Sequence, residues 1–262
     1  AVAALRVLRR RELFRLSCAE LLGALEVQQV GVALTDVTDA VIDGALQAVL
    51  RTTSDPPAFV VVAMGRYGGG ELGLGSDADV MFCYDGDRQE AGAIAHLVAN
   101  TLRELLMAPS TDPELVIDAD LRPEGRNGPL VRSLESFASY YGRWSAGWEA
   151  QALLRAQVGV GDAALGQRFT ALIDPMRYPQ GGLTPAALGD IRRLKARMES
   201  ERLPRGVDPA LHLKLGPGAL SDVEWVVQIL QLSHAHDHPG LRTSQTLTAL
   251  RSAVASGLVE QS

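Results

Sequence analysis

A run of glycines between two short apolar segments most constrains how this chain can fold. The segment Ala58–Met64 is apolar and rich in valine, which predicts a buried strand. The glycine-rich stretch Gly65–Gly75 follows it, and Val80–Tyr84 then predicts a second buried strand. Helical patterns flank this region on both sides, so we expect a small core that contains both strands and helices at about residues 51–132.

Carboxylates are concentrated where these strands begin and end. Asp77 and Asp79 enter the second strand, and their spacing of two predicts that both project from one face. A third strand is predicted over Leu115–Leu121, with Asp118 and Asp120 on one of its faces. Because unpaired acids on a buried strand are costly and carboxylates bind hard cations, we expect these residues to converge on a divalent metal such as Mg²⁺.

The glycines themselves indicate a phosphate site. Without a Cβ, their backbone N–H groups can approach phosphate closely, and Arg66 could hold a terminal phosphate bidentately. Taken alone, a glycine run is more often a flexible loop, and an Asp-x-Asp pair is often a turn or a helix cap. The order of strand, glycines and acids favours a metal–triphosphate site over these structural alternatives.

Three segments are predicted along the chain: a helical lead-in at 1–50, a catalytic core at 51–132 and a helical domain at 133–262, which we expect to be truncated. Thr35 or Asp36 is the expected cap of a second lead-in helix, and Ser133 caps a helix after the core. Ser221 and Glu224 have capping-box spacing. The other helices are predicted at 4–26, 91–106, 148–158, 188–203, 220–232 and 243–258.

Composition excludes several classes of protein. The chain has 262 residues with a formal net charge of -6, which argues against a general nucleic-acid binder. It has no apolar run of about 18 residues and no apolar signal segment at its start. We therefore expect a cytoplasmic protein without nucleic-acid or membrane partners. Cys18 and Cys83 lie among apolar neighbours, so both are predicted to be buried free thiols.

These motifs resemble the polymerase-β-type nucleotidyltransferases and, more narrowly, the glutamine synthetase adenylyltransferase family. The resemblance rests on five stretches in family order, at residues 65–73, 75–82, 121–130, 148–156 and 214–225. It implies an α+β fold, in which a polymerase-β-like nucleotidyltransferase core, with a small mixed sheet and helices, is followed by a helical-bundle domain.

The resemblance also implies an activity: Mg²⁺-dependent transfer of AMP from ATP to a tyrosine of glutamine synthetase, which releases pyrophosphate and down-regulates nitrogen assimilation. The sequence around Ser76 and Ser221 is more similar to the adenylylating half of this family. The implied partners are ATP, glutamine synthetase and, for the full-length enzyme, a PII-type signalling protein. The implied catalytic and metal-binding residues are Asp77, Asp79 and Asp118, and the implied ATP-binding residues are Gly65, Arg66, Gly68, Gly69, Gly70, Ser76, Arg122 and Lys214.

Two departures from the family pattern concern the site. Arg66 stands where lysine is usual, and Asp120 stands where many relatives have arginine; by family position Asp118 is the third metal ligand. Three alternatives remain open at this stage. The chain could be the adenylyl-removing half, which uses phosphate and forms ADP; a sugar-nucleotide glycosyltransferase; or a non-catalytic docking module.

Overall fold

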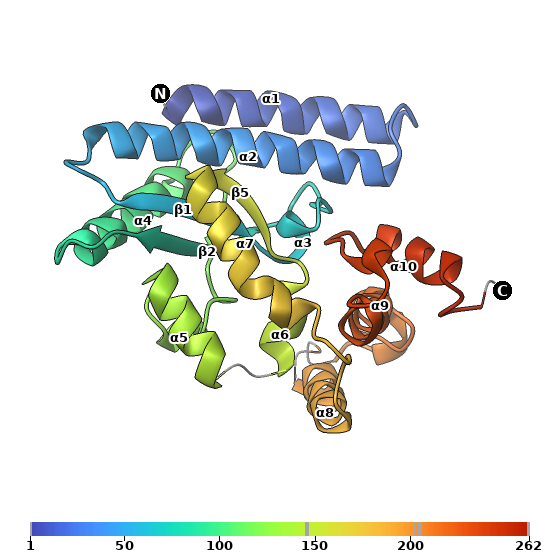
Figure 1. Cartoon of the computed structure of the whole chain (residues 1–262). Coiled ribbons are helices and arrows are strands. Elements are labelled where there is room, and N and C mark those ends of the chain that lie inside the picture. The colour runs from blue at the N-terminus through green and yellow to red at the C-terminus, as the bar shows by residue number, and fades with distance from the viewer. Residues whose placement is uncertain (1, 145–146, 202, 204–205, 261–262) are drawn as a thin grey trace. The chain divides into compact units, whose positions relative to one another are not determined.

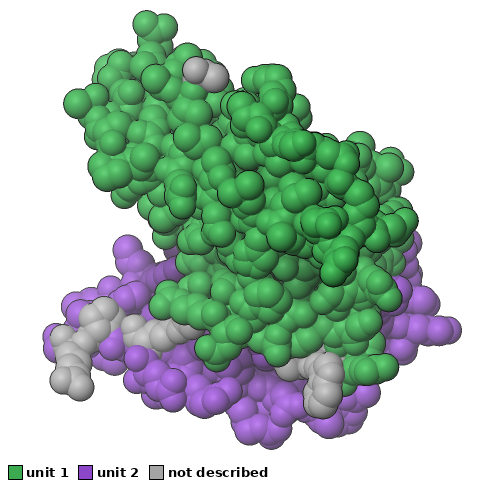
Figure 2. Space-filling model, turned by 90° about the vertical axis from the view of Figure 1, so that its left-hand side faces the viewer, with its two compact units in different colours: residues 1–144, 155–172 green, residues 145–154, 173–262 purple. Residues whose placement is uncertain are grey.

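The computed structural model describes residues 2–144, 147–201, 203 and 206–260, which form two compact units. Unit 1 comprises residues 1–144 and 155–172, and unit 2 comprises residues 145–154 and 173–262 (Figure 2). This division differs from the predicted ranges 1–50, 51–132 and 133–262. The lead-in helices belong to unit 1 because they share one apolar cluster with the sheet.

Unit 1 contains a mixed five-stranded sheet (Figure 1). Strand β1 (Ala58–Ala63) pairs antiparallel with β2 (Ala78–Asp85) and with β5 (Gln157–Gly161). Strands β3 (Ile117–Asp118) and β4 (Val131–Ser133) pair parallel with β2. The two predicted buried strands are confirmed, so the mixed α+β composition of the core is confirmed as well.

The structure corrects one strand prediction and one helix prediction. The third strand was predicted over residues 115–121, but the observed strand β3 contains only Ile117 and Asp118. The helix predicted over 148–158 ends early: α6 (Gly147–Leu153) is followed by β5. Val160 on β5 is buried, whereas Gly159 and Gly161 on either side of it are exposed. This alternation of buried and exposed residues is typical of a strand, and it follows directly after the helical pattern.

The lead-in forms two helices, α1 (Val2–Leu21) and α2 (Val27–Thr52). The prediction that Thr35 or Asp36 caps the second helix is wrong. The helix begins at Val27, and the N–H of the preceding Glu26 donates to Gln29 Oε1 at 2.9 Å. Thr35 lies inside the helix, where its Oγ1 donates to the Gly31 carbonyl oxygen. The remaining helices that begin in unit 1 are α3 (Gly65–Gly68), α4 (Ala91–Met107), η1 (Gly125–Asn127), α5 (Leu134–Trp144) and α7 (Ala163–Arg177). As predicted, Ser133 Oγ accepts a capping bond, from the Ser136 N–H at 3.0 Å.

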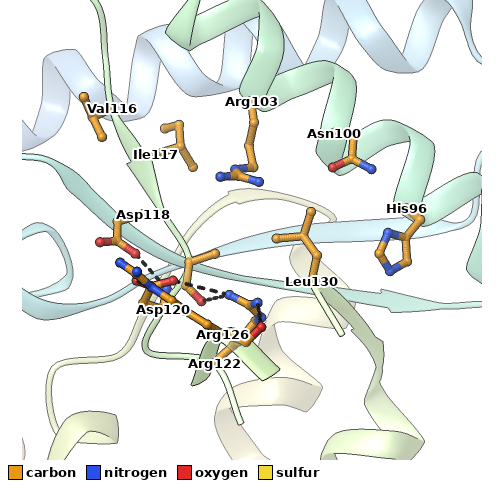
Figure 3. Close-up of a pocket in the computed structure, with 11 residues that line it drawn as sticks. His96, Asn100, Arg103, Val116, Ile117, Asp118, Asp120, Arg122, Arg126 and Leu130 are labelled. Carbon is orange, nitrogen blue, oxygen red and sulfur yellow. Dashed lines mark hydrogen bonds and ion pairs between the residues drawn. The ribbon is translucent and has the colours of Figure 1, made fainter. Parts of the chain in front are cut away.

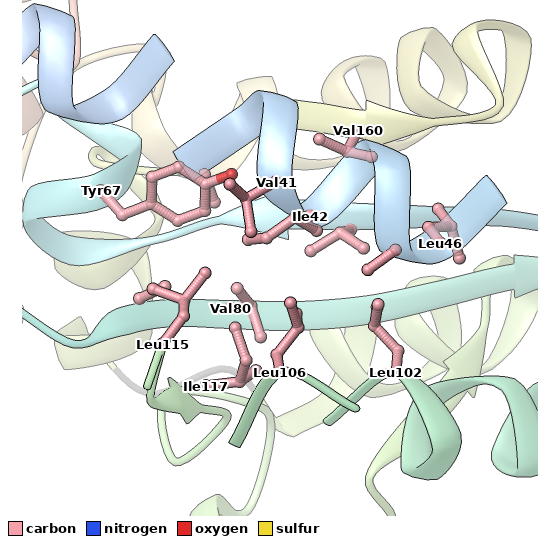
Figure 4. Close-up of a cluster of buried hydrophobic side chains, with 14 of the residues drawn as sticks. Val41, Ile42, Leu46, Tyr67, Val80, Leu102, Leu106, Leu115, Ile117 and Val160 are labelled. Carbon is pink, nitrogen blue, oxygen red and sulfur yellow. The ribbon is translucent and has the colours of Figure 1, made fainter. Parts of the chain in front are cut away.

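One apolar cluster joins α2, the sheet and α4 in the interior of unit 1 (Figure 4). Ile42 and Leu46 from α2 are fully buried in it, as is Val80 from β2, and Leu102 contributes from α4. Burial of each such side chain contributes about 1.5–3 kcal/mol to stability. The cluster therefore fixes β2, and with it Asp79, against two long helices.

Unit 2 is helical. It contains α6, α8 (Pro185–Glu201), η2 (Pro209–Leu211), α9 (Leu220–His234), η3 (Pro239–Leu241) and α10 (Thr246–Ala255). Leu154, Ile191 and Leu232 form one of its buried clusters. The predicted helices at 188–203, 220–232 and 243–258 are thus present, with shifted ends.

The predicted capping box at the start of α9 is wrong. The helix begins after Ala219, and Ser221 Oγ is buried without a hydrogen-bond partner in the described part of the chain. Asp222 instead accepts the Gly218 N–H at 2.7 Å and forms an ion pair with Lys195.

Two further expectations concern the cysteines and the membrane. Cys83 is a buried free thiol, and burial, together with the charge of Asp85, raises its pKa to about 12. Cys18 is also free but only half-buried, which corrects the prediction that both are buried.

None of the helices among the described residues combines the length and the apolar character that a membrane span requires.

The cluster of Figure 4 predicts a difference between two leucines of unit 1. Leu46 is 0% exposed and Leu97 is 59% exposed. We expect Leu46→Ala to lower the free energy of unfolding by about 2–5 kcal/mol through loss of apolar burial and creation of a cavity. Leu97→Ala should change it by less than about 0.5 kcal/mol. Urea denaturation measures both, and equal losses would contradict this account of the core.

Candidate functional site

Two carboxylates meet at the start of β2. The parallel pairing of β2 with β3 places Ala78 beside Ile117 and Asp79 beside Asp118. Residues in register on neighbouring strands share a face, and strands lie about 4.8 Å apart. Ala78 and Ile117 are buried, whereas Asp79 and Asp118 are half-buried. The two acids are therefore neighbours on the face opposite to these apolar side chains.

The other predicted acids lie differently. Asp77 precedes β2 and is exposed. The prediction that Asp118 and Asp120 share a strand face is wrong, because β3 ends at Asp118. The Asp118 Oδ1 atom accepts the Asp120 N–H at 2.7 Å, which turns the chain at this point.

The Asp120 carboxylate forms ion pairs with two arginines (Figure 3). Its carboxylate lies 2.5 Å from Arg126 Nε and 3.7 Å from Arg122 Nη1. The hydrogen bond to Asp120 raises the pKa of Arg126. This pairing neutralises Asp120, and it favours Asp118 over Asp120 as the acid that acts together with Asp79.

Glycine is required at position 65. Gly65 has φ +54°, and a Cβ there would lie 2.3 Å from Asp79 Oδ2. The neighbouring Met64 N–H donates to the Asp79 carbonyl oxygen at 2.8 Å. The turn after β1 therefore lies directly against the Asp79 carboxylate, and only a residue without a side chain leaves room for it.

The next three predicted phosphate ligands form the turn of α3. The N–H groups of Gly68, Gly69 and Gly70 donate to the carbonyl oxygens of Met64, Gly65 and Tyr67. A Cβ on Gly68 would lie 1.9 Å from the Arg155 carbonyl oxygen, so this glycine permits close backbone packing. Their role in phosphate binding stays a prediction, and in this structure their N–H groups bond within the turn.

The other predicted ATP-binding residues occupy separate places. Ser76 Oγ accepts the Gly73 N–H at 2.9 Å and so shapes the turn that leads to Asp77. Arg66 is half-buried on α3. Lys214 belongs to unit 2, where it is exposed between η2 and α9.

Arg122 closes the turn that follows Asp118. Its guanidinium donates to the carbonyl oxygens of Ala119 at 2.7 Å, Gly128 at 3.1 Å and Arg126 at 3.1 Å. Burial lowers the pKa of Arg122, and the charge of Asp120 opposes this effect. Arg122 thus positions the backbone after β3, and a contact with phosphate would compete with these three bonds.

Arg155 holds the glycine turn, a role that was not predicted from the sequence. Its side chain is 8% exposed; Nε donates to the Gly65 carbonyl oxygen at 2.9 Å, and Nη2 lies 2.5 Å from Glu71 Oε2. The only sequence signal was an arginine directly after an apolar run in one of the matched stretches. Arg155 therefore connects Gly65 at the start of α3 to Glu71, three residues beyond its end.

Helix α2 also contacts this turn. The Tyr67 hydroxyl donates to Asp39, and burial raises the pKa of both groups. A Cβ on Gly31 of α2 would lie 3.1 Å from the Gly70 carbonyl oxygen. The glycine turn is thus contacted both by α2 and by Arg155.

The arrangement can be compared with the needs of a metal ion. In residues 2–144, 147–201, 203 and 206–260 no three His, Cys, Asp or Glu side chains are grouped as a metal site would require. Mg²⁺ in nucleotide sites is usually held by one or two carboxylates together with substrate phosphates. The paired Asp79 and Asp118 provide hard oxygen donors of that kind.

The position of Gly65 predicts different effects for two glycine substitutions. Gly65→Ala should lower the free energy of unfolding by at least about 1–3 kcal/mol, because alanine is strained at this φ and collides with Asp79. Gly75 has open space around its Cβ position, so Gly75→Ala should change stability by less than about 1 kcal/mol. Chemical denaturation measures both. If Gly65→Ala is tolerated as well as Gly75→Ala, the turn does not require glycine.

The burial of Arg155 predicts that its ion pair is worth more than a surface pair. Arg155→Met should cost about 2–3 kcal/mol, because the Gly65 carbonyl and Glu71 each lose their bond to the buried guanidinium. Arg168, whose side chain is 58% exposed, pairs with Asp85 and serves as the control; Arg168→Met should cost less than about 1 kcal/mol. Thermal and urea unfolding of both variants would show whether the costs differ in this direction.

Comparison with known proteins gives two family-model matches and several relatives of one name. Residues 1–172 match the family model described as glutamate-ammonia ligase adenylyltransferase, and residues 191–262 match the model described as GlnD PII-uridylyltransferase. The chain is 55% identical to the bifunctional glutamine synthetase adenylyltransferase/adenylyl-removing enzyme of Streptomyces coelicolor, where the alignment covers 100% of this chain and 28% of the relative. It is 54% identical to the protein of the same name from Cutibacterium acnes, over 100% of this chain and 26% of the relative.

A third relative of the same name, from Mycobacterium avium, is 52% identical over 99% of this chain and 27% of its own length. The chain thus spans between a quarter and a third of the length of these curated relatives. The family match covers the sheet, the glycine turn and the paired acids of unit 1. The chain belongs to the glutamate-ammonia ligase adenylyltransferase family.

Proposed function

We propose that unit 1 is the catalytic core that transfers AMP from ATP to a tyrosine of glutamine synthetase. The observation that carries the proposal is the register pairing of Asp79 with Asp118 beside the glycine turn. Paired carboxylates next to a turn with little steric bulk are suited to a nucleotide triphosphate with its cation. The names of the relatives, which include both an adenylyltransferase and an adenylyl-removing enzyme, support the same reaction class.

The ion best suited to these donors is Mg²⁺, which Asp79 and Asp118 would hold, with Asp77 on the exposed segment before β2 as the third acid. When bound, Mg²⁺ supplies neutralisation of charge on the phosphate oxygens. Gly65 leaves the space that keeps Asp79 in position, and the Asp120 N–H fixes the orientation of Asp118. Arg66 on α3 is the candidate contact for a terminal phosphate.

In the proposed reaction the phenolic oxygen of the tyrosine forms a bond to the α-phosphorus of ATP. The bond from that phosphorus to the bridging oxygen breaks, and pyrophosphate leaves with the electron pair. The phenolic proton passes to the Asp118 carboxylate. Most of the rate enhancement then comes from positioning and from stabilisation of charge on the phosphates.

Direction and regulation are part of this proposal. The sequence around Ser76 and Ser221 favours adenylylation. The second candidate is phosphorolytic removal of AMP, because the names of the relatives include an adenylyl-removing enzyme. The match of residues 191–262 to a PII-uridylyltransferase model favours a PII-type signalling protein as a partner of the whole protein.

An assay of AMP transfer tests the proposal. We expect the chain to transfer α-labelled AMP from ATP to unmodified glutamine synthetase in the presence of Mg²⁺. Asp79→Asn should reduce the rate at least about 100-fold, because it removes a charge beside the reacting phosphates. Asp87→Asn changes an exposed aspartate just beyond the far end of β2 and should leave the rate unchanged.

Two results would overturn the assignment. One is transfer that survives Asp79→Asn at the native rate. The other is no transfer together with release of ADP when adenylylated glutamine synthetase is supplied with phosphate, which would establish the removing reaction instead.

A further inference from the structure

A polar hollow of about 580 Å³ lies in unit 1 between β4, α5 and the turn that precedes β4. Every residue that lines it has a polar or charged side chain, and these residues are Glu124, Arg132, Ser136, Ser139, Tyr140 and Arg143. None of them has a part in the transfer chemistry described above, so the hollow needs a separate explanation.

One face of α5 forms a wall of this hollow (Figure 1). The lining residues of α5 follow one another at spacings of three, one and three, so they lie on the same side of the helix: Ser136, Ser139, Tyr140 and Arg143. Phe137, on another side of α5, is 1% exposed and belongs to the interior. Its burial holds the helix in place while the polar side faces the hollow.

Arg132 is already partnered within the hollow. Its guanidinium forms an ion pair with Glu124, donates to Ser136 Oγ at 3.1 Å and lies 5.2 Å from the centroid of the Tyr140 ring. The Arg132 side chain is only 11% exposed. This pairing neutralises the Glu124 carboxylate and fixes the arrangement of the lining.

Arg143 supplies the charge that is left over. Two arginines and one glutamate line the hollow, so its formal charge is +1. Arg143 is exposed, and neither its guanidinium nor the Ser139 hydroxyl has a hydrogen bond or an ion pair within residues 2–144, 147–201, 203 and 206–260. These two donors lie one helical turn apart on the same side of α5, and together they suit a carboxylate.

The register of the sheet relates the hollow to the paired acids. Arg132 on β4 lies opposite Cys83 on β2, and Cys83 is four residues beyond Asp79. Because side chains alternate along a strand, Arg132 lies on the same face of the sheet as Asp79, about 13 Å away along β2. An extended peptide advances by the same rise per residue. A peptide whose tyrosine reaches Asp79 therefore brings a residue about four positions away to the hollow.

We propose that the hollow binds an acidic side chain of the protein substrate, an aspartate or glutamate about four residues from the tyrosine that receives AMP. Arg143 and Ser139 donate to its carboxylate, and the paired Arg132 and Glu124 form the remainder of the site. The inference rests on the proposed function, because it takes glutamine synthetase to be the protein that is modified. It makes Arg143 a residue that selects the tyrosine.

Steady-state AMP transfer to unmodified glutamine synthetase tests the role of Arg143. Arg143→Glu reverses the free charge and should raise the KM for glutamine synthetase at least about tenfold, with less than about a twofold change in kcat and in the KM for ATP. Arg143→Lys keeps the charge and should remain within about threefold of the native KM. Arg51→Glu, which changes an exposed arginine near the end of α2, is the control and should leave these constants unchanged.

A binding assay without ATP tests the docking separately from the reaction. Unmodified glutamine synthetase should bind the immobilised native chain, and Arg143→Glu should weaken this binding at least about tenfold. Tyrosine peptides with glutamate four residues before or after the tyrosine serve as competitors. The better of the two should compete at least about fivefold more strongly than the same peptide with glutamine at that position.

The results distinguish failure of the reaction from failure of the docking site. If Arg143→Glu weakens the binding of glutamine synthetase but the native chain transfers no AMP, the proposed reaction fails and the docking site is supported. If AMP is transferred and Arg143→Glu has the native KM, or Arg51→Glu loses as much, the docking site is overturned.

Three further results would also overturn the docking site. They are a native chain that does not bind glutamine synthetase, equal competition by the glutamate and glutamine peptides, and self-association of the native chain that Arg143→Glu abolishes. The last of these would make the hollow an interface between copies of this chain.

Discussion

The parallel pairing of two residues of β2 with two residues of β3 is the constraint on which the candidate site depends. It places Asp79 beside Asp118 although 38 residues separate them in the chain. The same pairing fixes the orientation of both, because Ala78 and Ile117 are buried on the opposite face. A shift of β3 by one residue against β2 would turn Asp118 toward the apolar core. Burial of the apolar pair therefore holds the polar pair in place.

The local sequence pattern predicted much of unit 1 correctly. The apolar runs that became β1 and β2 have a length and a β-branched content that only a buried strand suits, and the glycines between them formed a tight turn. Asp79 was correctly placed where the second strand begins. These features depend on neighbours within a few residues, which a sequence displays directly.

The errors arose where distant contacts decide the structure. The first two residues of β5 were predicted as the end of a helix and the rest of the strand was missed, because its partner β1 is about a hundred residues away. Asp120 was placed on a strand, but the Asp118 side chain captures its N–H and turns the chain. Arg155 reaches Gly65 and Glu71 across the fold, and no pattern in its own segment indicated this contact. Lys214 belongs to the other unit, so the structure leaves its predicted role as a prediction.

The arginine clamp after β3 has a consequence for the order of folding. Arg122 binds carbonyl groups three, four and six residues away, so its turn can close with a small loss of chain entropy. The strand pairing that precedes the turn must instead close a long loop. The turn can thus exist as a preformed piece before the sheet is complete, and the late event is its attachment to β2. The candidate site would then be among the last parts of unit 1 to assemble. Until it has assembled, this part of the incompletely folded chain is accessible to chaperones and proteases.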